Sequence, residues 1–567
     1  MKRKRHAAAA GLSQRHARLQ PFNATTNTVV ISNHMKKSAF LHRFRRLNQS
    51  RGARTLVFLL LASLATTGAR AESREQWFAE GQAKLRELQK QKHTNRPAKN
   101  VILFVGDGMG VSTVTASRIL EGQLRGQTGE ENALSFEKFP YTAFSKTYSV
   151  NQQVSDSAPT MTAMVTGVKT EDGILSIDQD VVRGQYQTVA GNELITILEQ
   201  AEQRGMSTGL VSTARITHAT PAACYAHSPN RDWEDDSSLP ADAKAAGFPD
   251  IARQLIEFKY GDGLEVALGG GRQHFLPRTA PDPEDAGRTG NRRDGRNLTT
   301  EWTRKFVRSA YVWKKAQFDA INPKSTAHLL GLFERSHMEY EADRSTDTGG
   351  EPSLREMTSK AIQVLSNNKK GYFLMVEAGR IDHAHHAGNA YRALTDTIEM
   401  SKAVKRAREL TGDDTLIVVT ADHSHVFTIA GYPARGNDIL GLVRDPDDSG
   451  APSASPSLDM LGLPYTTLGY ANGPGYTGTS NQQAEGLKFF PHAPSAYDGI
   501  HNERPLITDA DTDRIDFMQE ATVPLSSETH AGEDVAIYAD GPNAQLFRGT
   551  LEQTMVYHVM ADALKLR

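Results

Sequence analysis

Acidic and histidine residues follow several short apolar segments of this chain at the point where each segment ends. Residues 101–105 (VILFV) run into Asp107, and residues 416–419 (LIVV) run into Asp422 and His423. The same holds for two more segments, because 372–376 (YFLMV) precedes Glu377, Asp382 and His386, and 209–211 (GLV) precedes His218 and Thr220. In an open parallel sheet, ligands bind just beyond the carboxyl ends of the strands. These side chains are therefore expected to meet at one place.

Carboxylates that converge without partners repel one another, and some of them would have to stay protonated. Divalent cations remove that cost, and carboxylate, imidazole and hydroxyl groups are their usual ligands. Taken singly, each Asp or Glu is more simply a helix cap, a turn residue or a surface residue. Four segment ends that carry such residues together favour a metal site.

Two further spacings support a site of this kind. Asp382 and His386 are four residues apart, so they share one face if that segment is helical. The segment 156–164 (DSAPTMTAM) predicts a helix that begins near Ser157, with Pro159 in its first turn. A serine there lies at the positive end of the helix dipole, which favours a phosphate dianion, although a serine that only caps the helix is the simpler alternative.

The elements that must position these residues alternate along the chain. The four apolar segments are short and rich in β-branched residues, which is typical of strands buried on both faces. Between them lie amphipathic stretches, including 192–204, with Asn192 as its cap and Gly205 as its stop, and a helix preceded by the capping box of Ser353 and Glu356. This alternation predicts an α/β fold with a mainly parallel central sheet and helices on both faces.

Three stretches depart from this rhythm. Residues from about 273 to 350 mix charge, Gly and Pro, and residues from about 427 to 525 are rich in Gly, Pro, Asn and Ser. Loops of this length are usually functional or form small subdomains, so we expect two insertions. The acidic segment 231–246 is expected to be a solvated surface loop.

Composition excludes several classes of protein. The chain is 38% hydrophobic and 23% charged, unlike a disordered, collagen-like or multi-span membrane chain. The net charge of −1 conceals two unlike parts, since residues 1–71 carry 14 Lys and Arg and no Asp or Glu, whereas the remaining 496 residues carry a net −15. So acidic a body is poorly suited to bind nucleic acid, but it suits divalent cations.

Residues 1–71 are expected to be a secretory leader. The apolar segment 56–65 follows a basic cluster and precedes Ala69-Arg70-Ala71, the order of a signal peptide cleaved before Glu72. Met35 is a second candidate start. Only 15 uncharged residues separate Arg54 from Arg70, too few for the roughly 20 that cross a bilayer, although a membrane anchor is the alternative. The mature protein, residues 72–567, is therefore expected to be exported to the periplasm or the extracellular space.

Cys224 is the only cysteine of the chain, so no intrachain disulfide can form. We expect a buried thiol without a reactive role, because free cysteine is among the most buried residue types.

Six motifs, in order along residues 98–565, resemble the alkaline phosphatases. They are 105–110 (VGDGMG), 156–158 (DSA), 218–222 (HATPA), 376–383 (VEAGRIDH), 420–425 (TADHSH) and 528–534 (ETHAGED). Several of them, together with 269–272 (GGGR) and 472–476 (NGPGY), are closer to the vertebrate type than to well-known bacterial members. Six motifs in register are far more specific than any one of them.

The resemblance implies two zinc ions and one magnesium ion. Asp382, His386 and His530 would hold the first zinc, and Asp107, Asp422 and His423 would hold the second. Asp107, Thr220 and Glu377 would form the magnesium site, with His218 and His383 beside the ligands. His385, His425 and Trp233 are read as structural or supporting residues.

The resemblance also implies the reaction. Ser157 would be the nucleophile and Arg231, oriented by Asp156, the phosphate clamp, so that phosphate monoesters are hydrolysed to an alcohol and inorganic phosphate through a phosphoserine intermediate. The alternatives are phosphodiester hydrolysis and a catalytically silent protein that binds phosphate or metal on the same fold. Small phosphorylated molecules are the expected substrates.

The vertebrate type carries a calcium site as well. Glu284, Phe333 through its carbonyl, Glu334 and Glu351 lie where its ligands are expected, although Glu351 follows an added Gly349-Gly350. The stretch 427–525 resembles the family's crown insertion. A homodimer is implied by the resemblance, and a C-terminal lipid anchor is not expected because the chain ends in ALKLR without an apolar tail.

Overall fold

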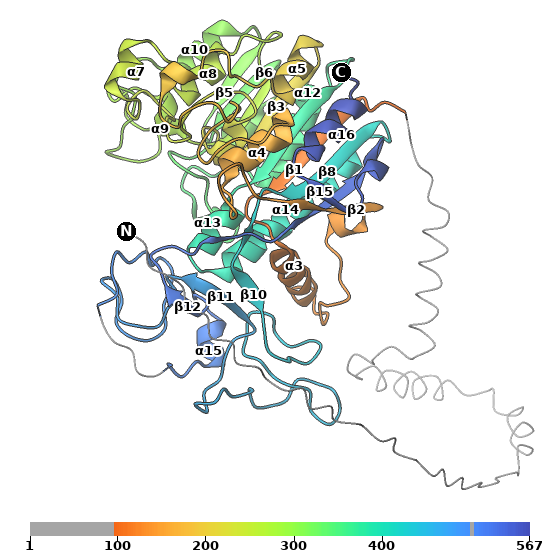
Figure 1. Cartoon of the computed structure of the whole chain (residues 1–567), viewed down its shortest axis with the longest axis vertical. Coiled ribbons are helices and arrows are strands. Elements are labelled where there is room, and N and C mark those ends of the chain that lie inside the picture. The colour runs from red at the N-terminus through yellow and green to blue at the C-terminus, as the bar shows by residue number, and fades with distance from the viewer. Residues whose placement is uncertain (1–95, 499–503, 567) are drawn as a thin grey trace, which may run out of the picture. The chain divides into compact units, whose positions relative to one another are not determined.

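A ten-stranded sheet forms the centre of the protein (Figure 1) in the computed structural model, which describes residues 96–498 and 504–566. Its strand order is β15-β2-β14-β8-β1-β7-β3-β4-β6-β5. The strands are β1 (Asn100–Gly106), β2 (Tyr141–Lys146), β3 (Ser207–Arg215), β4 (Val266–Gly270), β5 (Ser309–Val312), β6 (His328–Leu332), β7 (Tyr372–Ala378), β8 (Thr415–Ala421), β14 (Val535–Asp540) and β15 (Thr550–Glu552). The seven strands from β8 to β5 are parallel, and β14 runs antiparallel to both of its neighbours. The predicted mainly parallel sheet is confirmed.

Helices cover both faces of this sheet because alternate residues of its strands point to opposite faces. In β1, Val101, Leu103 and Val105 join one hydrophobic core, whereas Ile102 and Phe104 join the other. The first core is completed by α4 (Ser157–Thr166), α5 (Ile197–Gln203), α6 (Ala219–Ala222), α8 (Ile251–Glu257), α10 (Leu298–Lys305) and α16 (Met555–Ala563). The second is completed by α3 (Val111–Gln123), α11 (Lys315–Ala320), α12 (Leu354–Leu365), α13 (Arg380–His386) and α14 (Ala390–Leu410).

Helix starts follow local capping chemistry. The capping box of Ser353 and Glu356 precedes α12 as predicted. Helix α4 begins at Ser157, also as predicted. The prediction for 192–204 was wrong at its start, because Thr196 caps α5 through a capping box with Glu199 and the residues before it form a turn and an isolated bridge.

Residues 427–498 and 504–525 form a separate small unit below the main sheet in Figure 1. It is built on a three-stranded sheet of β10 (Phe427–Ile429), β11 (Leu468–Gly473) and β12 (Ala521–Pro524), with α15 (Asp509–Thr512). Phe427, Leu468 and Tyr470 pack against apolar residues of α3 and α14. This unit is the expected crown-like insertion, and it is called the crown below.

Residues 273–350 are more regular than their composition indicated. They include α10, α11, β5 and β6, and the two strands extend the main sheet at its edge. The acidic segment 231–246 was wrongly predicted as a solvated loop, because Trp233 and Asp235 are buried and α7 (Ala241–Ala245) lies within it. The remaining helix, α9 (Arg272–Phe275), follows β4.

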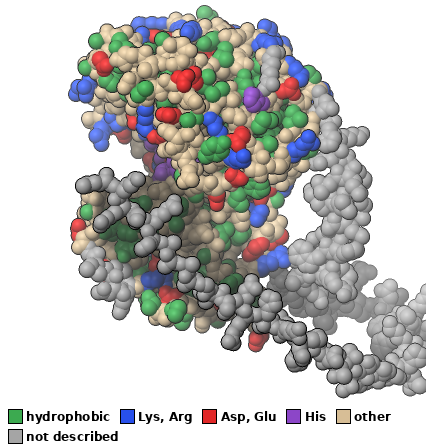
Figure 2. Space-filling view, in the orientation of Figure 1, with side chains coloured by type: hydrophobic (Ala, Val, Ile, Leu, Met, Phe, Trp, Pro, Cys, Tyr) green, Lys and Arg blue, Asp and Glu red, His purple; other side chains and the backbone are tan. Residues whose placement is uncertain are grey.

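The secretory leader predicted for residues 1–71 lies outside the described residues. Among the described residues, no helix is long and apolar enough to span a bilayer. Figure 2 shows acidic and basic side chains interspersed over the visible face of the α/β portion. Cys224 is fully buried, as predicted.

Candidate active site

The carboxyl ends of the central parallel strands bring the predicted acidic residues together. Gly106 at the end of β1 lies beside Ala421 of β8 and Ala378 of β7 in the sheet register. Asp107 and Asp422 therefore leave the sheet side by side. The convergence expected at the strand ends is confirmed for β1, β7 and β8.

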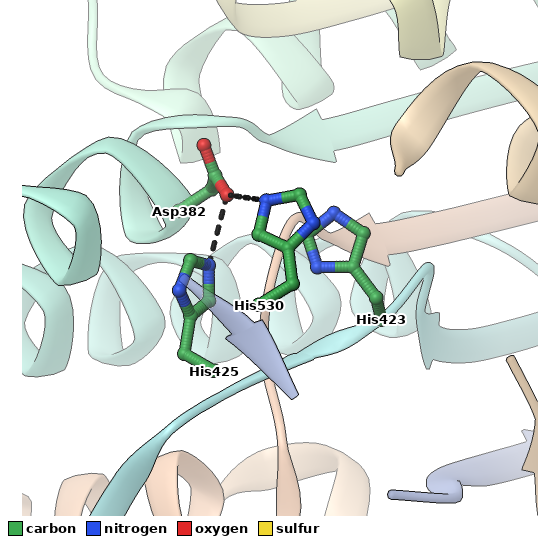
Figure 3. Close-up of side chains that lie close together, drawn as sticks. All are labelled: Asp382, His423, His425 and His530. Atoms are coloured by element: carbon green, nitrogen blue, oxygen red, sulfur yellow. Dashed lines mark hydrogen bonds and ion pairs between the residues drawn. The ribbon is translucent and has the colours of Figure 1, made fainter. Parts of the chain in front are cut away.

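Three ligand atoms of the first predicted zinc site form a nearly equilateral triangle. Asp382 Oδ1 lies 3.3 Å from His386 Nε2 and 3.3 Å from His530 Nε2, and the two nitrogens lie 3.2 Å apart. Figure 3 shows how Asp382 and His530 face each other. Ligands about 2.0–2.1 Å from a tetrahedral zinc ion are roughly 3.3 Å apart, so the spacing suits such an ion.

The other ring nitrogen of each histidine fixes its orientation. His386 Nδ1 lies 2.5 Å from the carbonyl of Glu528, and His530 Nδ1 lies 2.8 Å from the carbonyl of Ser155. A carbonyl only accepts, so each Nδ1 donates and Nε2 is the ring nitrogen that faces Asp382. Metal-ligating histidines are oriented in this way.

The second predicted zinc set lies next to the first. His423 Nε2 lies 3.3 Å from Asp422 Oδ2 and 3.5 Å from Asp107 Oδ1, and all three side chains are fully buried. The ring of His423 stacks on that of His530 with 3.6 Å between their centroids. Ser157 Oγ lies 3.3 Å from His423 Nε2 and 3.4 Å from Asp107 Oδ1. The first turn of α4 thus presents its hydroxyl to this set.

The predicted magnesium set contains buried oxygens that lack partners. Asp107 Oδ2, Thr220 Oγ1 and Glu377 Oε1 are buried and accept or donate no hydrogen bond within the described residues. Asp107 and Glu377 also have ligand atoms within 4.8 Å of His218. Buried polar atoms are nearly always paired, so this set fits a bound cation.

The electrostatics of the buried carboxylates also favour bound cations. Burial raises the pKa of Asp107 well above its ordinary value, and the neighbouring Asp422 and Asp382 raise it further. Burial and Asp422 likewise raise the pKa of Glu377 to about 7. Burial also opposes ionisation of Asp382, but the adjacent His386 and His425 hold its pKa well below the usual range. Cations at the site would let all these carboxylates ionise together.

Arg231, the predicted phosphate clamp, lies beside Asp156 and His218. Its guanidinium contacts Asp156, and its Nη2 lies 3.0 Å from His218 Nε2. Burial opposes ionisation of Asp156, but Arg231 outweighs it and lowers the pKa of Asp156. Burial and the charge of Arg231 lower the pKa of His218 to about 3, so its ring is neutral.

The turn that carries Arg231 is held by ion pairs that sequence reasoning missed. Glu234 accepts two hydrogen bonds from Arg215, at 2.7 and 2.8 Å. Asp235 lies 2.6 Å from His274 Nδ1. The acidic residues after Arg231 therefore anchor the turn to the end of β3 and to α9.

Four further residues support the predicted ligands, and of these only His425 was predicted as a structural or supporting residue. His425 Nε2 lies 2.8 Å from Asp382 Oδ1, and its Nδ1 lies 2.5 Å from Glu528 Oε2 (Figure 3 shows His425 beside Asp382). Ser212 Oγ donates to Glu377, and Gln553 Nε2 lies 2.9 Å from the carbonyl of Asp422. Glu528 stands in the motif ETH and could have been found there; Ser212 and Gln553 have no signal in the sequence.

His385, Trp233 and His383 each contact neighbouring side chains. His385 Nδ1 lies 2.8 Å from Tyr470 Oη, and its Nε2 lies 3.0 Å from Thr113 Oγ1. Trp233 packs edge-on against Phe248. The ring of His383 lies 5.6 Å from that of His218.

A separate acidic cluster lies near the predicted calcium ligands. Glu284, Glu334 and Asp347 have carboxylate oxygens within 4.8 Å of one another. Glu351 is not in this cluster, because its carboxylate accepts from the backbone N–H of Glu339 at 3.1 and 3.3 Å. The carbonyl of Phe333 accepts from Arg272 at 3.0 Å, and Arg272 also donates to Glu284 at 2.8 Å. Burial and Glu284 raise the pKa of Glu334 to about 8.

The fold and the site define a class, that of hydrolases whose α/β sheet gathers metal ligands at its carboxyl end. The model of the alkaline phosphatase family matches residues 98–566. Alkaline phosphatase of Gadus morhua is 44% identical over 472 residues, which are 82% of this chain and 91% of that protein. The tissue-nonspecific alkaline phosphatase of Homo sapiens is 44% identical over 483 residues, 84% of this chain and 85% of that protein.

Solved structures agree with the fold. Alkaline phosphatase of Thermus thermophilus superposes with a TM-score of 0.58 at 24% identity, covering 85% of this chain and 94% of that one. The enzyme of the Antarctic bacterium TAB5 gives a TM-score of 0.54 at 20% identity, covering 83% and 100%. The chain belongs to the alkaline phosphatase family, and it is an enzyme that hydrolyses phosphate monoesters.

Proposed function

We propose that the hydrolysis proceeds through a phosphoserine at Ser157. The observation that carries this proposal is the position of Ser157 Oγ, 3.3 Å from His423 Nε2 and 3.4 Å from Asp107 Oδ1. A hydroxyl at the start of α4, among buried metal-ligand types and on the side of Arg231, is placed for in-line attack on a phosphate.

Two zinc ions and one magnesium ion fit the three sets of side chains described above. The first zinc would be held by Asp382, His386 and His530, and the second by Asp107, Asp422 and His423. Magnesium would be held by Asp107, Thr220 and Glu377, each of which has one buried oxygen without a partner among the described residues. Such ions neutralise charge on phosphate oxygens and favour deprotonated oxygen nucleophiles.

The chain's own groups perform the remaining work. Ser157 Oγ forms a bond to phosphorus as the bond to the alcohol oxygen breaks, and the alcohol leaves with a proton. A water oxygen then bonds to phosphorus, Ser157 Oγ is released, and inorganic phosphate results. Arg231 donates its planar fork of N–H groups to two phosphate oxygens, while Asp156 holds its orientation.

The test compares p-nitrophenyl phosphate hydrolysis by the zinc- and magnesium-loaded enzyme, Ser157→Ala and Ser359→Ala. Ser359, a partly exposed serine of α12, is the matched control. We expect Ser157→Ala to lose at least about 10³-fold in kcat, and acid quenching with labelled substrate to trap label on wild-type Ser157 only. Retained activity or no trapped label would overturn the covalent route.

The same assay separates the alternatives. A monoesterase hydrolyses p-nitrophenyl phosphate far faster than bis-p-nitrophenyl phosphate, whereas a diesterase shows the reverse preference. A silent binding protein would bind inorganic phosphate and hydrolyse neither substrate.

We also propose a calcium site at the cluster of Glu284, Glu334 and Asp347, with the carbonyl of Phe333. Asp347 takes the place that the resemblance gives to Glu351, because its carboxylate lies with the other two. Oxygen-only ligands of this kind suit calcium rather than zinc. Equilibrium dialysis measures how many calcium ions the zinc- and magnesium-loaded protein binds. We expect Asp347→Asn to bind one calcium ion fewer than the wild type.

Export and assembly complete the proposal. The basic and apolar order of residues 1–71 supports export to the periplasm or the extracellular space, and N-terminal sequencing of the secreted protein is expected to begin at Glu72. Membership of the family supports a homodimer, which light scattering would detect as twice the mass of the mature chain.

A further inference from the structure

Four part-exposed basic side chains border the candidate site, and we call them the basic rim. They are Arg215 at the end of β3, His337 after β6, and Arg380 and His383 in α13. The rings of His337 and His383 are tilted against each other with 4.1 Å between their centroids. Segments that are far apart in the sequence thus bring basic groups to one edge of the site.

Arg380 is the arginine of the rim that forms no ion pair within the described residues. Its guanidinium lies over the ring of Tyr340, 3.7 Å from the centroid. Its Nε is buried without a hydrogen-bond partner, and no carboxylate within the described residues forms an ion pair with it. By contrast, Arg215 and Arg231 each contact a carboxylate. Arg380 is therefore held in place with its Nε donor unpaired within the described residues, while burial raises the pKa of Glu339 and of Asp396 and the charge of Arg380 lowers both from a distance.

His337 adds donors that lack acceptors. The backbone N–H of Arg215 donates to its Nδ1 at 3.3 Å, and the Arg215 guanidinium contacts its Nε2. Burial, together with His383 and Arg215, lowers the pKa of His337 well below its usual value, so the ring is neutral. A neutral imidazole has only one acceptor nitrogen. In one of the two contacts, therefore, an N–H of Arg215 faces a ring nitrogen of His337 that also carries a proton.

The rim is continuous with the phosphate clamp. The ring of His383 lies 5.6 Å from that of His218, whose Nε2 lies 3.0 Å from Arg231 Nη2. The Nδ1 atoms of His218 and His383 are buried and unpartnered within the described residues. Three nitrogens along this edge, Nδ1 of His218, Nδ1 of His383 and Nε of Arg380, thus lack hydrogen-bond partners among the described residues, and acceptor oxygens would satisfy those that carry a proton.

We propose that the basic rim is a second anion subsite, which binds an anionic group on the leaving alcohol while the reacting phosphate lies at Ser157 and Arg231. The preferred substrates are then phosphate monoesters whose alcohol carries a second phosphate or a carboxylate. Guanidinium groups recognise both anions through paired N–H donors. This inference rests on the proposed placement of the reacting phosphate.

The test uses pairs of substrates that differ only in the second anion. Propane-1,3-diol bisphosphate is compared with propyl phosphate, and hexane-1,6-diol bisphosphate with hexyl phosphate, on the zinc- and magnesium-loaded enzyme. The two chain lengths measure the span between the subsites, and 4-phosphobutyrate tests a carboxylate in place of the second phosphate. We expect at least one bisphosphate to exceed its monophosphate by roughly tenfold in kcat/KM.

Variants assign that preference to the rim. Arg380→Gln is expected to reduce the bisphosphate-to-monophosphate ratio of kcat/KM to near one, mainly through KM, and Arg380→Lys is expected to restore part of it because the charge returns. Arg406→Gln on α14 removes an equal charge away from the site and should keep the wild-type ratio. Zinc content of each variant shows that α13 keeps its ligands.

Two outcomes would overturn the subsite. One is a wild-type enzyme that hydrolyses both members of every pair with equal kcat/KM, a result that needs no variant. The other is a preference that survives in Arg380→Gln. Failure of the wild type to hydrolyse any of the monoesters would instead contradict the proposed function.

Discussion

At the scale of single residues, the orientation of Arg231 depends on one carboxylate. Asp156 is the N-cap residue of α4, yet its side chain makes no capping hydrogen bond and contacts Arg231 instead. A residue type that commonly stabilises a helix start thus contacts the proposed phosphate clamp instead.

Asp156→Asn should therefore weaken phosphate binding. We expect KM for p-nitrophenyl phosphate and Ki for inorganic phosphate to rise about tenfold, because the neutral amide holds Arg231 less firmly. Steady-state kinetics with phosphate as a competitive inhibitor measure both constants. The control is Asp232→Asn, which changes the exposed residue that directly follows Arg231. Equal effects in the two variants would contradict a specific role for Asp156.

His218 controls the charge beside the magnesium set. It has a ligand atom within 4.8 Å of those of Asp107 and Glu377. His218→Asp adds a third carboxylate, so we expect tighter magnesium binding, by about tenfold, and full activity at a lower pH. Equilibrium dialysis of the zinc-loaded protein measures the affinity. Unchanged or weaker magnesium binding would count against this account.

At the scale of elements, local chemistry sets where helices begin. Ser353 accepts from the backbone N–H of Glu356 at 3.3 Å, and Glu356 accepts from that of Ser353 at 2.9 Å. Ser353→Ala should lower the free energy of unfolding by about 1 kcal/mol, because it leaves a helix donor without this partner. The urea midpoint measures the change, with Ser359→Ala on the same helix as control. Equal midpoints would refute the capping role.

The strands that position the site could be predicted because they are buried on both faces. A continuous apolar run such as VILFV marks a central parallel strand, and the polar residue that follows marks the site. The edge strand β15 and its neighbour β2 carry no such run, and the apolar run of β14 (VAIYA) does not show that this strand is antiparallel. Their positions depend on register with neighbours that are distant in sequence, which one sequence does not encode locally.

The proposed metal ligands also divide into those that local sequence predicts and those that it does not. Asp107, Asp422 and His423 follow predictable strands, whereas His530 arrives from more than a hundred residues beyond His423 and was assigned by family resemblance alone. Asp347 and Glu351 show the limit of that approach. Asp347 lies in the acidic cluster and Glu351 does not. Which of the two joins the cluster depends on the path of the loop around Gly349 and Gly350, and neither spacing nor a motif predicts that path.

At the scale of the whole molecule, the buried carboxylates link metal content to stability. The pKa of Glu377 in the folded chain without metal is about 7, above its ordinary value of 4.5. A carboxyl group with a raised pKa contributes stability at low pH that is lost as pH rises through the folded value. Asp107 shifts in the same direction.

Chelated protein should therefore lose stability as pH rises through about 7, whereas metal-loaded protein should not, because the cations replace the protons. Tm measured from pH 5.5 to 8.5, with and without chelator, checks this expectation. The gap between the two curves should widen with pH. A constant gap would mean that these carboxylates do not govern the dependence.

The chain crosses the site on both sides of the crown. It leaves through β9 (Ser424–His425) and returns through β13 (His530–Ala531), and these two strands pair with each other, His425 opposite His530. This pairing closes the loop at its base, so His425 and His530 lie side by side although the crown separates them in the sequence. Insertions, deletions and substitutions in the crown can therefore leave the residues of the site in place.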